Sequence, residues 1–79
     1  MDEDLAQAIM AALRRAREPV LEPVLYERVA HEGGDPAPER FLAVLERLLV
    51  DGHVRLSVEH ETPVRVRPPF QPRYYRPDK

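Results

Sequence analysis

The sequence has no cysteine and no tryptophan, and only five of its 79 residues are aromatic. Without cysteine, neither a disulfide nor a thiolate metal site can supplement a small hydrophobic core. No apolar run approaches the ~20 residues that a membrane-spanning helix needs. The acidic start MDEDLAQ also lacks the basic and then apolar layout of a secretion signal. These absences predict a cytoplasmic protein with no membrane partner, whose stability depends on packing alone.

Residues suited to catalysis are also sparse. His31, His53 and His60 fall in different predicted elements, without the HxH or HxxxH spacing typical of zinc ligands. Ser57 is the only serine, and its strand neighbours offer no general base. There is no glycine-rich phosphate loop. We therefore expect a non-enzyme that uses no metal or other cofactor.

Charge is present in quantity but is unevenly distributed. Residues 1 to 62 hold thirteen acids against seven arginines, which gives -6. Residues 63 to 79 hold five basic residues against one acid, which gives +4, so the two parts sum to the net charge of -2. Such asymmetry suggests that the C-terminal end meets an anionic surface, although arginines beside extended segments also serve solubility.

Apolar residues at helical spacing predict three helices, at about 3 to 17, 23 to 32 and 36 to 51. Pro19 separates the first two helices, because proline removes a backbone donor and clashes with the preceding turn. The segment GGDPAPE then predicts a tight turn, with Asp35 as the N-cap of the third helix.

After Gly52 the apolar period changes from that of a helix to that of a strand. Strands at about 53 to 59 and 63 to 67 are predicted to form an antiparallel hairpin, which completes a domain over residues 1 to 67. Residues 68 to 79 contain four prolines, too many for a paired central strand, so this segment is predicted to be an edge strand or an extended tail. It supplies little apparent core, and we expect the domain to survive its removal.

The apolar positions that face inward in every element predict the core. They are Leu13, Leu25, Val29, Phe41, Leu45, Leu48, Leu49 and Leu56.

The fold class expected from this order is α+β, mainly α with a small β-hairpin. The order of elements, helix, extended segment, helix, turn, helix and hairpin, resembles a winged helix-turn-helix domain over about residues 4 to 67. The motif LERLLVDGHVRL carries this resemblance at the junction of the third helix and the wing. RYYRP is similar to the closing wing strand of MarR and PadR-type regulators. The resemblance implies three helices followed by a two-stranded antiparallel wing.

The resemblance also implies that the third helix enters the major groove of DNA while the wing reaches a phosphate strand or the minor groove. Arg40 and Arg47, seven residues apart, share a face of that helix opposite its leucines, where they are candidates to bind guanine edges or phosphates. Glu39 and Glu46 lie on the same helix and would repel phosphates. The alternative is that the two arginines are solvated residues paired with these glutamates.

The candidate phosphate contacts in the wing and tail are Arg55, Arg65, Arg67, Arg73 and Arg76. The planar guanidinium suits this role because it makes two hydrogen bonds to a phosphate at once. Tyr74, Tyr75 and Phe70 lie among these arginines. They are candidates for partner binding, by stacking on bases or by contacting another protein, and the alternative is that they pack in the core.

Two functions from different classes follow. The first is a small winged-helix DNA-binding protein, a dimeric transcriptional regulator whose third helix and basic wing contact duplex DNA. The second is a protein-interaction module that docks a larger assembly through its surface and its proline-rich tail.

Overall fold

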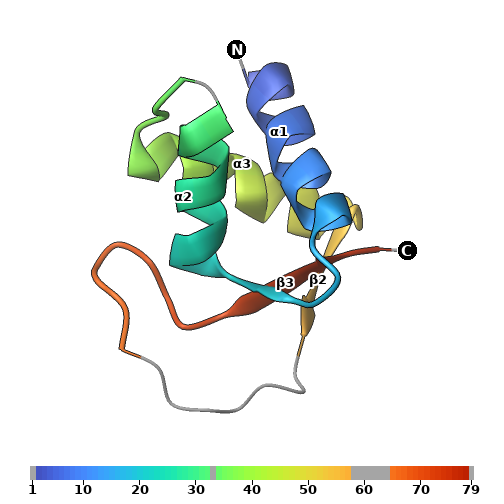
Figure 1. Cartoon of the computed structure of the whole chain (residues 1–79). Coiled ribbons are helices and arrows are strands. Elements are labelled where there is room, and N and C mark those ends of the chain that lie inside the picture. The colour runs from blue at the N-terminus through green and yellow to red at the C-terminus, as the bar shows by residue number, and fades with distance from the viewer. Residues whose placement is uncertain (1, 33, 58–64, 79) are drawn as a thin grey trace.

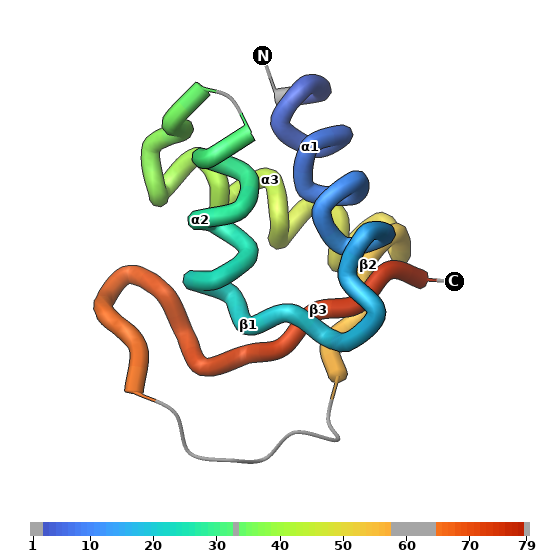
Figure 2. Tube along the Cα trace, viewed as in Figure 1, coloured from blue at the N-terminus to red at the C-terminus, as the bar shows by residue number. Residues whose placement is uncertain are grey.

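The computed structural model describes residues 2–32, 34–57 and 65–78, which form three helices and a small sheet. In chain order the elements are α1 (Asp2–Arg15), β1 (Val20–Leu21), α2 (Glu22–Glu32), α3 (Pro38–Val50), β2 (Val54–Ser57) and β3 (Tyr74–Pro77). Figure 1 shows the helices gathered over one side of the sheet. The tube in Figure 2 shows how the C-terminal segment returns beside β1, far from it in sequence. The fold class is α+β.

The three predicted helices are confirmed, with small changes at their ends. The third helix begins later than expected, since Ala37 is its N-cap and Pro38 its first residue, in place of Asp35 and Pro36. Ala37 has an extended backbone with φ of -61° and ψ of 140°, as expected for a residue before proline. Proline at the first helical position loses no hydrogen bond, because that amide has no partner within the helix.

The sheet corrects the predicted pairing. Its strand order is β1-β3-β2, and both pairs are antiparallel. The return strand predicted at 63 to 67 is wrong, because residues 65–67 form no strand; residues 63 and 64 lie outside the described residues. The partner of β2 is β3, in the segment predicted to be a tail or an edge strand.

The prolines of this C-terminal segment do not prevent β3 from being the central strand. Pro68, Pro69 and Pro72 precede the strand, and Pro77 is its last residue. No proline therefore interrupts the middle of the ladder, where a missing N–H would cost a hydrogen bond. The number of prolines was therefore misleading, because the positions of the prolines relative to the strand decide whether the segment can pair on both sides.

Most of the predicted core is confirmed. The buried apolar residues are Leu5, Ile9, Ala12, Leu13, Val20, Leu25, Val29, Phe41, Val44, Leu45, Leu48, Val54 and Tyr75. Leu49 is partly buried against this core. The prediction that Leu56 belongs to the core is wrong, since 42% of this residue is exposed. It pairs with Tyr75 and so shares that residue's side of the sheet, but it lies on an edge strand that the helices leave partly uncovered.

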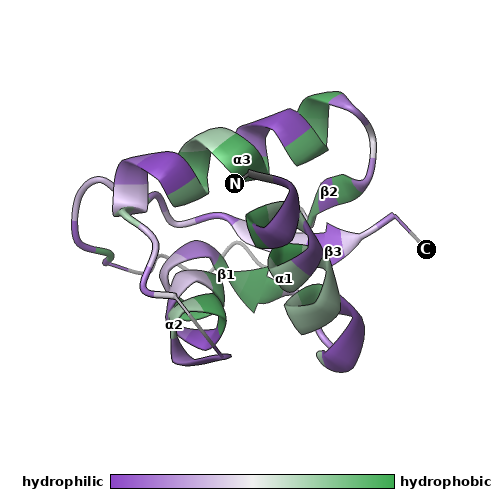
Figure 3. Ribbon diagram, turned by 90° about the horizontal axis from the view of Figure 1, so that it is seen from above, coloured by the Kyte–Doolittle hydropathy of each residue, from purple (hydrophilic) through white to green (hydrophobic). Residues whose placement is uncertain are grey.

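The hydropathy view in Figure 3 shows α3 running across α1 and α2, with apolar and polar turns alternating along it. This pattern is that of a helix buried on one face only. Within the described residues, none of the helices combines the length and apolar character needed to cross a bilayer.

Candidate nucleic-acid interface

Two arginines stand side by side on the outer face of the sheet. Arg55 of β2 and Arg76 of β3 are directly paired in the antiparallel register, and both are exposed. Directly opposite residues project from the same face of a sheet. Since the neighbouring pair of Leu56 and Tyr75 faces the helices, the two arginines project away from them. Two positive charges therefore meet on the solvent side of the sheet.

One acid partly balances this pair. The Nε of Arg55 donates to Oδ1 of Asp78 at 2.5 Å, with 60% and 37% of the two side chains exposed. Nη1 of Arg76 lies 3.5 Å from the carbonyl oxygen of Pro77, the limit of a hydrogen bond. Exposed ion pairs are worth only about 0 to 1 kcal/mol, so neither guanidinium is held strongly away from another anion.

Arg65 and Arg67 are exposed and lie in an irregular segment that leads to β3. Within this segment the amide of Phe70 donates to the carbonyl oxygen of Arg67 at 3.0 Å. The ring of Phe70 attaches the segment to the helices. The ring of Phe70 lies 5.2 Å from that of Tyr26 and 6.4 Å from that of Phe41, measured between centroids. Phe70 therefore packs against other rings of the protein, in agreement with the alternative prediction that it contributes to the core.

A buried carboxylate holds the start of β3. Glu22, the first residue of α2, is 0% exposed. Its Oε1 accepts hydrogen bonds from the Tyr75 hydroxyl at 2.6 Å and from Nη2 of Arg73 at 3.3 Å. Its Oε2 accepts one from the amide of Gln71 at 2.6 Å. A buried charge needs such partners, because removal from water costs several kcal/mol unless it is paired and hydrogen-bonded.

Arg73 and Tyr75 belong to this network and not to the outer face. The guanidinium carbon of Arg73 lies 5.6 Å from the centroid of the Tyr75 ring, and the carbonyl oxygen of Arg73 accepts from the Glu22 amide at 2.9 Å. Nε of Arg73 is buried, and no described residue forms a hydrogen bond with it. Burial, followed by the hydrogen bond to Glu22 and its charge, raises the pKa of the Tyr75 hydroxyl far above its ordinary value.

Tyr74 projects from the outer face, since it pairs with Ser57 of β2 and neighbours Arg76 by period-two alternation. It is half-buried and lines a hollow with Leu21 and Arg17. The two adjacent tyrosines thus point to opposite sides of the sheet. One is internal, and the other is accessible to a partner.

Nothing in the local sequence pattern distinguishes Glu22 from an ordinary surface glutamate. A glutamate at the start of a helix ordinarily interacts with the positive end of the helix dipole, which gives no sign of burial. Its partners lie 49 to 53 residues further along the chain, in a segment predicted to be a tail. The burial of Glu22 could have been predicted only if β3 had first been recognised as the central strand beside β1.

Arg40 and Arg47 are exposed on α3, on the side that borders the acidic start of α1. Arg40 lines a hollow of about 200 Å³ together with Asp4. Arg47 lines another, of about 280 Å³, together with Glu3 and Asp51. Acids therefore stand beside both candidate base-reading residues and reduce the attraction of this side of α3 for phosphate.

The described residues thus bring Arg55, Arg76 and Tyr74 together on the outer face of the sheet, and place Arg73 with Glu22 inside. Within residues 2–32, 34–57 and 65–78, no three His, Cys, Asp or Glu side chains cluster as a metal site would require, and His60 lies outside these ranges. Comparisons with protein-family models, curated proteins and solved structures find no match for the chain.

Proposed function

We propose that this protein is a small winged-helix DNA-binding protein that contacts duplex phosphates through the outer face of its sheet and the segment before β3. The surface that we propose comprises Arg55, Arg65, Arg67 and Arg76. The order of helices and strands supports this proposal, because it is the order expected from the resemblance to winged helix-turn-helix domains. A role in transcriptional regulation remains part of the proposal.

The observation that carries the proposal is the cross-strand pair of Arg55 and Arg76. Like charges directly opposite in an antiparallel pair destabilise a sheet. Among residues 2–32, 34–57 and 65–78, the carboxylate bonded to the pair is that of Asp78, through an exposed ion pair of little strength. An anionic partner such as a phosphate backbone would offset this repulsion, and guanidinium groups match phosphate geometry.

The role of α3 in this proposal is smaller than the resemblance alone implies. Arg40 and Arg47 remain candidates to read bases, but acids of α1 border both of them. A surface in which phosphate contacts dominate binds many sequences with similar affinity, because phosphates carry no sequence information. We therefore expect weak discrimination between duplexes.

The alternative function, docking of another protein by the aromatic residues of the tail, has less support. Phe70 is partly buried against Tyr26 and Phe41, and Tyr75 is fully buried, so little of these two rings is left for a partner to contact. Tyr74 alone of the three candidates reaches the outer face.

Fluorescence anisotropy with a labelled random duplex at two salt concentrations tests the proposal. Replacing Arg55 and Arg76 with alanine should weaken binding and reduce the slope of log affinity against log salt by about one unit per lost phosphate contact. The matched control is Arg14→Glu, which lowers the net charge by the same two units at the exposed end of α1 and leaves the ion pair of Arg15 with Glu32 in place. No measurable affinity of the unaltered protein at low salt, or equal effects of the double variant and the Arg14 control, would refute the proposed interface.

A further inference from the structure

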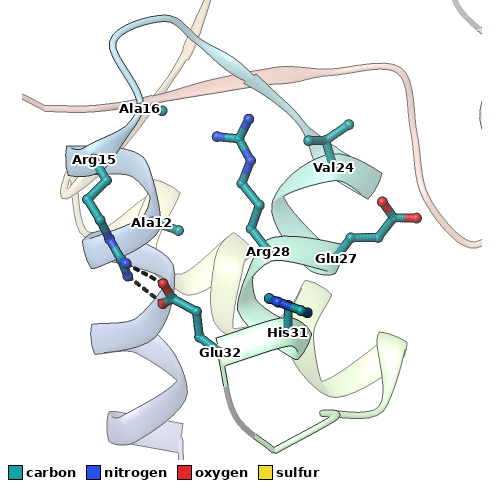
Figure 4. Close-up of a pocket in the computed structure, with 8 residues that line it drawn as sticks. All are labelled: Ala12, Arg15, Ala16, Val24, Glu27, Arg28, His31 and Glu32. Carbon is teal, nitrogen blue, oxygen red and sulfur yellow. Dashed lines mark hydrogen bonds and ion pairs between the residues drawn. The ribbon is translucent and has the colours of Figure 1, made fainter.

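A continuous groove runs between α1 and α2. It consists of two adjoining hollows of about 510 and 530 Å³ that share Ala16, Val24 and Arg28. Figure 4 looks into the first hollow, with α3 lying behind the two helices. Val24, 37% exposed, provides apolar surface in the groove. The second hollow reaches Tyr74 of β3 and so adjoins the outer face of the sheet, but neither Arg55 nor Arg76 lines the groove.

The charged groups of the groove occur in equal numbers of each sign. Arg15 and Glu32 form an ion pair across the first hollow, between α1 and α2. The remaining charged residues of the lining are Arg17, Glu18, Glu27 and Arg28. Among the described residues, these four make no hydrogen bond or ion pair through their side chains. Two arginines and two glutamates are thus available to a partner.

This balance of charge favours one kind of partner. A strongly acidic segment would be repelled by Glu18 and Glu27, and a strongly basic one by Arg17 and Arg28. A second copy of the groove presents both signs and so matches the first. Isologous contacts, in which the same patch meets itself about a twofold axis, are the commonest way in which identical chains associate.

We propose that the α1–α2 groove is a homodimer interface, in which the α2 helices of two copies cross antiparallel about their midpoints. Residue 27 is the midpoint of α2, which covers Glu22–Glu32. An antiparallel crossing centred between residues 27 and 28, next to this midpoint, places Arg28 of each copy against the partner's Glu27, so that the twofold axis forms two equivalent ion pairs. Val24 of each copy then lies across from the partner's His31. The proposal does not depend on the proposed DNA-binding function.

The charge pattern also selects the direction of the crossing. In a parallel arrangement about a twofold axis, each residue of α2 would meet its own equivalent. Arg28 would then face the partner's Arg28, and Glu27 the partner's Glu27, so both contacts would be repulsive. The antiparallel crossing turns the same two positions into attractive contacts, flanked by the exposed side chain of Val24.

A charge-swap experiment tests this interface by sedimentation equilibrium between about 10 µM and 1 mM protein, the range in which a small polar interface is expected to associate. Glu27→Arg alone and Arg28→Glu alone should each weaken self-association by about tenfold or more, because each creates two like-charge contacts. An equimolar mixture of the two variants should restore association, since all its contacts between unlike chains are again attractive. The double variant carrying both substitutions should also associate as the unaltered protein does.

Arg14→Glu is the matched control, because Arg14 is exposed on α1 and does not line either hollow. Circular dichroism of each variant shows whether it is folded, and the double variant keeps the test valid if one single variant is not. Three results would overturn the proposal: a monomer at every concentration, single variants that associate as strongly as the unaltered protein, or a mixture in which association is not restored.

Discussion

The two sides of β3 use the same kinds of residue for opposite purposes. On the side that faces the helices, Arg73 and Tyr75 bind the carboxylate of Glu22, which is fully buried. On the outer side, Arg76 stands beside Arg55 in solvent. The inner arginine is held by a carboxylate that has no access to water, whereas the contact that the described residues give the outer one is weak. We infer that the inner side determines where the strand lies, and that the outer side is available to a partner.

Removal of the whole strand is expected to have the largest effect. A chain that ends at residue 67 loses the central strand of the sheet and the buried side chain of Tyr75, and it leaves Glu22 buried without its partners. We expect no cooperative thermal transition by circular dichroism. This reverses the expectation, drawn from the sequence, that the domain survives without its tail. A cooperative melt of the truncated chain would show that β3 is dispensable and that the sequence-based expectation was right.

Replacement of Glu22 with alanine should have the next largest effect. It leaves the Tyr75 hydroxyl, the Gln71 amide and the Arg73 guanidinium without their acceptor, so we expect a loss of about 3 kcal/mol in the free energy of unfolding. Urea denaturation measures this change. Glu27→Ala is the control, because Glu27 is exposed on the same helix and should change stability by less than about 0.5 kcal/mol. Equal effects of the two substitutions would mean that the buried network adds no stability.

The hydroxyl of Tyr75 should make stability depend on alkaline pH. The folded protein raises its pKa, so the hydroxyl stays protonated where the unfolded chain, with an ordinary tyrosine pKa of about 10, loses its proton. The unfolded state then binds fewer protons than the folded state. The free energy of unfolding should therefore fall above about pH 10, by up to about 1.4 kcal/mol per pH unit.

Tyr75→Phe should cost about 1 to 2 kcal/mol at neutral pH, because Glu22 loses one hydrogen bond, and it should remove this alkaline slope. Urea denaturation of both proteins at several pH values between 8 and about 11.5 measures the difference. Tyr74→Phe is the control on the outer side of the strand. The prediction is wrong if the two phenylalanine variants show the same dependence on pH.

The smallest effect is expected at the outer pair. Replacement of Asp78 with alanine removes the ion pair to Arg55, which is 60% exposed, and should change stability by less than about 1 kcal/mol. The same substitution should strengthen binding to duplex DNA, because it releases a guanidinium and removes a negative charge from the proposed interface. Anisotropy titration against the unaltered protein measures this gain. Weaker binding would show that Asp78 orients Arg55 for its partner.

Local features of the chain were predictable to the extent that their causes are local. The helical spacing of Phe41, Leu45 and Leu48 predicted α3 and its buried face, since periodicity reports directly which side of a helix avoids water. The change of period after Gly52 located β2. The alternation of polar and apolar residues also predicted that Arg55 lies on the exposed side of β2, whereas Arg76 was predicted to lie on a tail and not on a strand.

Features that depend on distant partners were not predictable in this way. Residues 65–67 alternate as a strand does, yet β2 pairs with β3, because register is decided by which side chains fill the core. Leu56 follows the alternation and is still 42% exposed. The residues of a strand do not indicate how far helices elsewhere in the chain cover it.

The amino-acid sequence by itself determined the three helices, the position of β2 and the concentration of positive charge near the C-terminus, because each arises from residues close together in the chain. The tertiary structure alone decided that β3 is the central strand, that Glu22 is buried and that Arg73 and Arg76 have different surroundings. The physical reason is that burial and hydrogen bonding depend on which segments meet in space. The partners of Glu22 lie 49 to 53 residues away along the chain, beyond the reach of any local pattern.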